Sequence, residues 1–134
     1  MEMETPGYVL AITSVGDTEE GFQRLADAIL EIDRSLEGLK KGQKNYKSSE
    51  WRKPPARKMK LQQAMDCPKE VVNLEEAAGR ISSEFVSLYP PGIPLIVPGE
   101  EISAGWIAYI QNCLEEGLDV HGLSSDLKMG VVYE

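Results

Sequence analysis

Residues 79–102 read GRISSEFVSLYPPGIPLIVPGEEI, and this stretch decides how the second half of the chain folds. Four prolines and two glycines fall in its later part, yet most of its other residues are apolar. Pro90-Pro91-Gly92 predicts a type II turn, because proline fixes φ and glycine accepts a positive φ. Leu95-Ile96-Val97, which two further prolines bracket, predicts an edge strand with a fixed start and end.

Such a segment has three possible roles: a recognition motif for another protein, a rigid structural hairpin, or the signature of a family. Pro91–Pro94 is formally a PxxP motif. Ligands of aromatic-groove modules need an exposed polyproline strand, usually with a basic residue at one end. Here the flanks are apolar and acids follow, and an exposed segment this apolar would aggregate. The sequence therefore favours a structural hairpin.

The composition describes a folded chain of 134 residues, enough for one modest domain or two small lobes. Its hydrophobic fraction of 42% is ordinary for a folded protein. No apolar run approaches the ~20 residues that span a bilayer, and MEMETPGY lacks the pattern of a secretory signal. We therefore expect a cytoplasmic protein with no membrane partner. Cys67 and Cys113, far apart and outside any CxxC motif, are expected to be reduced, buried thiols.

The formal net charge of −8 argues against a nucleic-acid partner, because phosphate contacts need a basic surface. The charge is uneven, since residues 39–60 hold nine of the fourteen basic residues. This basic segment is interpreted as a connecting stretch with little regular structure, anchored at Tyr46 and Trp51. Binding of an anionic partner through it is the alternative.

The N-terminal region predicts a strand followed by a helix. Residues 8–15 (YVLAITSV) form a continuous apolar run that suits a strand buried on both faces of a parallel sheet. Asp17, with Glu20 three residues later, is expected to cap a helix over residues 18–37. Apolar residues follow at helical spacing and make one stripe: Phe22, Leu25, Ala26, Ile29, Ile32 and Leu36. A strand and helix without partner strands suggest a piece of a larger sheet, so we expect the strand to pair with a neighbouring molecule or with the C-terminal lobe.

The remainder predicts a compact α+β unit. A helix is expected over residues 56–66, and Asn73 with Glu76 predicts a capping box that opens a short helix through Ala78. An extended run over residues 81–89 leads into the proline-rich turn. Ser103 is expected to cap a longer helix that Gly117 ends, and the last strand is expected over residues 128–133.

The search for catalytic motifs finds no phosphate loop, dinucleotide-binding turn or serine nucleophile elbow. The lone histidine, His121, has no second histidine with which to bind a metal and is interpreted as structural. The acid pairs Glu75-Glu76 and Glu100-Glu101 are expected at helix N-termini, where the helix dipole favours negative charge. Sequence neighbours on a helix do not face one another, so neither pair predicts acid–base catalysis.

With the preceding NLEEAA, the 79–102 stretch resembles the C-terminal domain of the Orn/Lys/Arg decarboxylases, which are pyridoxal-phosphate (PLP) enzymes of the aspartate-aminotransferase fold. YVLAITSVGDTEEGFQRLADAI similarly resembles the last strand and helix of the aminotransferase small domain. The resemblance implies three parts: residues 1–38 end the small domain, residues 39–55 form a basic linker, and residues 56–134 form the C-terminal domain. We call the following the signature residues and expect them to be structural, beside the active-site entrance and the subunit contacts: Gly79, Arg80, Ile81, Tyr89, Pro90, Pro91, Gly92, Ile93, Pro94, Pro98, Gly99 and Glu100.

The resemblance implies that the full enzyme removes the α-carboxyl group of arginine, lysine or ornithine in polyamine or diamine formation. PLP would serve as the electron sink. The lysine that holds PLP in the family follows a Ser-x-His-Lys motif, whereas His121 here is followed by Gly122. The chain is therefore expected to be a C-terminal portion of a bacterial enzyme, inactive alone, with no catalytic residue, no metal and no bound cofactor. Its expected partners are the other domains of an oligomeric enzyme, a dimer or larger.

One family site residue has a counterpart near the start of the chain. The family places a glutamate just before the small-domain strand, where it recognises the distal cationic end of the substrate. That position falls on Glu2, with Glu4 as the alternative register; both would otherwise lie in a disordered, solvated terminus. The alternative function is a stand-alone binding or regulatory module that shares this domain without catalytic activity.

Overall fold

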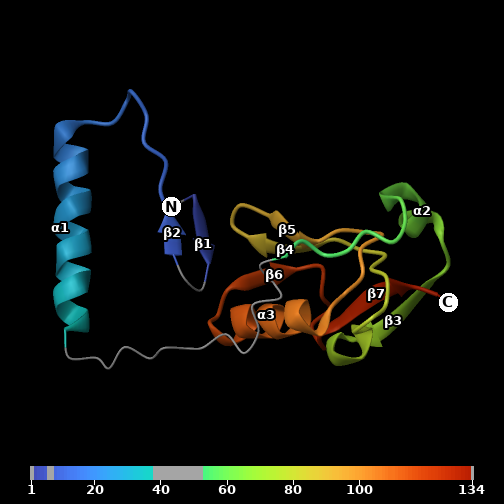
Figure 1. Cartoon of the computed structure of the whole chain (residues 1–134). Coiled ribbons are helices and arrows are strands. Elements are labelled where there is room, and N and C mark those ends of the chain that lie inside the picture. The colour runs from blue at the N-terminus through green and yellow to red at the C-terminus, as the bar shows by residue number, and fades with distance from the viewer. Residues whose placement is uncertain (1, 6–7, 38–52, 134) are drawn as a thin grey trace. The chain divides into compact units, whose positions relative to one another are not determined.

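The computed structural model describes residues 2–5, 8–37 and 53–133 (Figure 1). The chain divides into two units, one made of Met1–Leu10 with Tyr46–Glu134 and the other of Ala11–Asn45. Helices and short strands are mixed along the chain, which confirms the predicted α+β class. No described helix is long and apolar enough to cross a membrane.

The N-terminal hairpin pairs β1 (Met3–Thr5) with β2 (Tyr8–Leu10) in antiparallel fashion. The predicted strand over residues 8–15, buried on both faces, was wrong, because β2 ends at Leu10 and its side chains are exposed. Its partner lies in the same chain just upstream, where a short connection makes loop closure inexpensive. Beyond β2, the backbone N–H of Ser14 donates to the Asp17 carboxylate, a local turn that ends the extended run.

Helix α1 spans Glu19–Leu36 and agrees with the predicted helix over residues 18–37 apart from its terminal residues. Its N-cap is Thr18, whose hydroxyl accepts a hydrogen bond from the N–H of Gly21 at 3.1 Å, so the predicted cap at Asp17 was wrong. The Asp17 carboxylate is engaged by Ser14 instead. None of the residues of α1 is buried.

The C-terminal region holds two antiparallel sheets with α3 packed beside them (Figure 1). One sheet pairs β3 with β7, and the other has the order β5-β4-β6. The predicted last strand is confirmed, whereas the predicted helix over residues 56–66 begins only at Leu61, and β3 was not predicted. The elements in chain order are α2 (Leu61–Asp66), β3 (Lys69–Asn73), the 3-10 helix η2 (Leu74–Ala77), β4 (Val86–Tyr89), β5 (Ile93–Ile96), α3 (Ala104–Glu115), β6 (Asp119–His121) and β7 (Lys128–Val132).

Helix α3 supplies one wall of the core. The Ser103 hydroxyl accepts a hydrogen bond from the N–H of Trp106 at 3.3 Å, which confirms the predicted cap. Gly117, at φ +77°, follows the last turn as predicted. The core packs apolar side chains of α3 against those of both sheets, of η2 and of the segment before α3. These side chains are Leu74, Val86, Leu88, Ile96, Ile102, Trp106, Ile107, Ile110, Met129 and Val131.

The proline-rich stretch forms the β4–β5 hairpin at one side of the three-stranded sheet. Val86, Leu88 and Ile96 are buried, so the segment is a structural hairpin. Gly92 has the predicted positive φ, +97°, but its N–H donates to the carbonyl oxygen of Leu88 at 3.0 Å. This bond spans five residues, so it is wider than the hydrogen bond that closes a four-residue β-turn.

Short backbone pairings extend the β3–β7 sheet sideways. Single antiparallel bridges join Val131 to Ser82, Ile81 to Glu101, and Glu100 to Arg57. Segments 80–82, 99–101 and 56–58 therefore follow one another beside β7, and we call this set the bridged layer. Its last member belongs to the basic segment, whose described residues 53–60 hold this one isolated bridge and no helix or strand, in agreement with the little regular structure expected there. Tyr46 and Trp51 lie outside the described residues.

Candidate functional site

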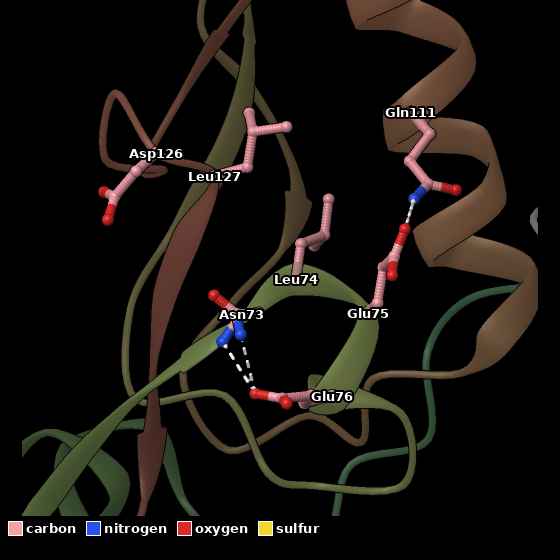
Figure 2. A pocket seen from close by; sticks show the side chains of 7 residues that line it. All are labelled: Asn73, Leu74, Glu75, Glu76, Gln111, Asp126 and Leu127. Atoms are coloured by element: carbon pink, nitrogen blue, oxygen red, sulfur yellow. Dashed lines mark hydrogen bonds between the residues drawn. The ribbon is translucent and has the colours of Figure 1, made fainter.

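A pocket of about 240 Å³ opens where η2, α3 and the turn before β7 meet (Figure 2). Both η2 and the turn are short, and the backbone N–H of Leu74 joins them by donating to the carbonyl oxygen of Leu127 at 2.9 Å. The pocket is lined by Asn73, Leu74, Glu75, Glu76, Gln111, Asp126 and Leu127.

The capping box predicted from the sequence builds one wall of this pocket. The Glu76 carboxylate accepts hydrogen bonds from the backbone N–H of Asn73 at 3.4 Å and from its side-chain amide at 3.0 Å. The element that follows is a 3-10 helix that ends at Ala77, one residue earlier than predicted. Glu75 is held separately, because the Gln111 amide on α3 donates to it at 3.3 Å.

The turn before β7 supplies the third carboxylate of the pocket, Asp126. Hydrogen bonds from Lys128 and Ser124 lower the pKa of Asp126 from its ordinary value of 3.8 to about 2. The same contact raises the pKa of Lys128, whose ammonium group pairs with the Asp126 carboxylate. Leu127 takes a φ of +56°, which turns the chain into β7.

This arrangement does not assemble a catalytic acid–base pair. Each of the three carboxylates has a partner of its own, and Figure 2 shows Asp126 pointing away from Glu75 and Glu76. General acid–base catalysis needs groups that face one reacting position. No cluster of three or more metal-ligating side chains occurs among residues 2–5, 8–37 and 53–133.

The pocket does not suit PLP either. The cofactor needs donors or cations for its phosphate and a lysine for its aldehyde. The pocket lining contains three carboxylates and no lysine. Lys128, next to it, is already paired with Asp126. The residues of this pocket therefore do not fit the cofactor.

The signature residues lie in two places. Tyr89–Pro94 form the end of β4, the turn and the start of β5, whereas Gly79–Ile81 and Pro98–Glu100 lie in or beside the bridged layer. In that layer the N–H of Gly99 donates to the carbonyl oxygen of Ser82 at 2.8 Å, and the N–H of Ser82 donates to that of Glu100 at 2.8 Å. The two ends of the proline-rich stretch are thus bonded to each other.

Gly99 and Glu100 each make a close contact that holds the local backbone. A Cβ atom on Gly99 would lie 2.5 Å from the carbonyl oxygen of Met59, and the residue has a φ of +91°. The Glu100 carboxylate accepts a hydrogen bond from the N–H of Val97 at 2.9 Å, and that of Glu101 pairs with Lys58 at 3.0 Å. This acid pair leads into α3 just before its Ser103 cap, as the sequence predicted, and both residues also belong to the bridged layer.

His121 lies on β6 and faces β4. Its Nε2 atom is 3.1 Å from Asp119 Oδ2, and its ring centroid is 5.3 Å from that of Tyr89. All three side chains are exposed by half or more, so the group lies on the protein surface.

The residues predicted to bind substrate lie in the N-terminal hairpin. The N–H of Glu2 donates to the carbonyl oxygen of Leu10 at 2.8 Å, and Glu4 pairs with Val9 in the β1–β2 ladder. Glu4 lies in strand β1 and Glu2 directly precedes it, whereas a disordered terminus was the expected alternative. The role of Glu2, or of Glu4 in the alternative register, stays a prediction.

Sequence reasoning singled out Asn73, Glu75 and Glu76 but missed the four other residues of the pocket. Asp126 had a detectable signal, since SSD before the last strand is typical of a tight turn. No sequence pattern marked Leu74, Gln111 or Leu127 as pocket residues. Of the cysteines, Cys113 is buried as predicted and burial raises the pKa of its thiol, whereas Cys67 is only half-buried; both are free.

Residues 43–134 match the family described as Orn/Lys/Arg decarboxylase, C-terminal domain. The chain belongs to this family. An arginine decarboxylase of Bacillus subtilis is 37% identical over 116 residues, covering 85% of this chain and 23% of the relative. The inducible lysine decarboxylase of Escherichia coli K12 is 38% identical over 61 residues, covering 43% of this chain and 8% of the relative.

The fold of solved family members agrees with that of this chain. Lysine decarboxylase A from Pseudomonas aeruginosa superposes with a TM-score of 0.63 at 22% identity, over 90% of this chain and 24% of that protein. The chain thus spans about a quarter of the length of the longer proteins that it resembles. Residues 43–134 correspond to the C-terminal domain of the Orn/Lys/Arg decarboxylases, as the proline-rich stretch predicted.

Proposed function

We propose that this chain is the C-terminal portion of a PLP-dependent decarboxylase that acts on arginine, lysine or ornithine. The observation that carries the proposal is the family match over residues 43–134. Relatives named as arginine and as lysine decarboxylases share this domain, which supports a small basic amino acid as the substrate class. The product would be a diamine or its guanidino counterpart.

The proposal assigns PLP and its lysine to a catalytic lobe outside these residues. Two observations support that division. His121 is followed by Gly122 and not by the lysine of the family motif, and the pocket at η2 is lined by carboxylates that would repel the cofactor phosphate. On this view the chain alone is inactive.

The contribution of this chain would be structural. The bridged layer and the β4–β5 hairpin form a rigid platform beside the catalytic lobe, and the uncovered apolar stripe of α1 supports packing against the rest of an aminotransferase small domain. In the oligomeric enzyme, Glu2 would face the guanidinium or ammonium end of the substrate. Carboxylate–guanidinium pairs make strong, charge-assisted hydrogen bonds, which fits that role.

The test compares this chain with the longest polypeptide that contains it. Release of labelled CO₂ is measured from carboxyl-labelled arginine, lysine and ornithine, each with PLP present. We expect release by the longer polypeptide with one of the three substrates and none by the chain alone. CO₂ release by the chain alone would refute the assignment of catalysis to another lobe, and a longer polypeptide inactive on all three substrates would refute the proposed activity.

A variant of the longer polypeptide tests the role of Glu2. Glu2→Gln is expected to raise KM about tenfold or more with a smaller effect on kcat, because it removes one charge-assisted bond to the substrate. Glu20→Gln, an equal change on exposed helix α1, is the matched control and should leave KM unchanged. Equal kinetics for the two variants would remove Glu2 from the substrate site.

A further inference from the structure

We draw no further inference here: the strongest candidate, the surface of the β5-β4-β6 sheet on which Tyr89, Asp119 and His121 lie together exposed, carries none because nothing in the structure shows what covers it.

Discussion

The Nη2 atom of Arg80 lies 2.8 Å from Glu70 Oε2 and 3.1 Å from the carbonyl oxygen of Val132. Glu70 belongs to β3 and Val132 ends β7, so one guanidinium group spans the two strands of the C-terminal sheet. The Arg80 side chain is only 25% exposed, which shields these bonds from water. Arg80 thus ties the end of β7 to β3.

Replacing this arginine should weaken the fold. Arg80→Ala is expected to lower the free energy of unfolding by about 2 kcal/mol, because it removes two hydrogen bonds from a charged donor. Urea unfolding of the whole chain, followed by tryptophan fluorescence, measures the change. Lys58→Ala is the matched control, since its pair with Glu101 is about half exposed and should contribute roughly 0.5 kcal/mol. Equal losses for both variants would contradict the bridging role of Arg80.

Gly122, which directly follows β6, should tolerate substitution less well than the other described glycines. Gly122 has a φ of +94°, and a Cβ atom there would lie 1.9 Å from the carbonyl oxygen of Phe85. Gly122→Ala must therefore move the backbone of β4 as well as adopt a strained φ. We expect it to lower the free energy of unfolding by roughly 3 kcal/mol or more, as overpacking and backbone strain add.

Gly117 provides the control for that variant. It has a similar φ of +77°, but an added Cβ would meet nothing within 4 Å. Gly117→Ala should therefore cost only the conformational term, about 1–2 kcal/mol. The same urea unfolding measurement compares the two. If the two variants were equally stable, close packing against Phe85 would not be the cause.

The pair of Asp126 and Lys128 should produce a measurable acid titration. Because the pKa of Asp126 is lowered from 3.8 to about 2, its stabilising contribution is present above pH about 4 and is lost as pH falls towards 2. Lys128 has a raised pKa, so its contribution is present below 10.5 and is lost as pH rises beyond that value. Both groups are exposed, so the effect on stability is expected to be small and the titration itself is the better readout.

Nuclear magnetic resonance of the Asp126 carboxyl carbon tests this prediction. Lys128→Met should move the pKa of Asp126 back towards its ordinary value, because the largest cause of the shift is removed. Lys58→Met, which changes a lysine of the bridged layer, should leave the titration of Asp126 as it was. An unchanged pKa in Lys128→Met would show that the hydrogen bonds from Ser124 and from the backbone set it.

The two thiols should differ in reactivity. Burial raises the pKa of Cys113, so little reactive thiolate forms at neutral pH, whereas Cys67 is half-buried. In the native chain, one equivalent of thiol, that of Cys67, should react quickly with a disulfide reagent. The thiol of Cys113 should react only after urea is added. Cys67→Ala should abolish the fast phase. A fast phase that persists in this variant would mean that Cys113 is accessible.

The features that the sequence predicted well are those that depend on neighbouring residues. Asn73 and Glu76 lie three positions apart, as do Ser103 and Trp106, so side-chain chemistry alone predicts both caps. Long-range pairing is different. Lys69 pairs with Val132 across most of the C-terminal region, and no local pattern marks Lys69–Asn73 as a strand.

The pocket likewise combines a locally determined wall with residues that only long-range packing brings to it. Its η2 wall follows from the capping box, which is local, whereas Gln111 and Asp126 reach it only because α3 and the last turn pack there. The N-terminal strand was misjudged for a related reason. An apolar run was interpreted as the interior of a larger sheet, but Tyr8–Leu10 pairs with the residues just before it and leaves its side chains exposed.

Residues 56–59, at the end of the bridged layer, cover the backbone edge of segment 99–101. The N–H groups of Lys58 and Met59 both donate to the carbonyl oxygen of Gly99, and the N–H of Glu101 donates to that of Ala56. Unsealed strand edges recruit strands from other molecules. A polypeptide trimmed to begin beyond Met59 would leave those groups bare and tend to aggregate. Residues 56–59 are therefore expected to limit self-association as well as to extend the layer.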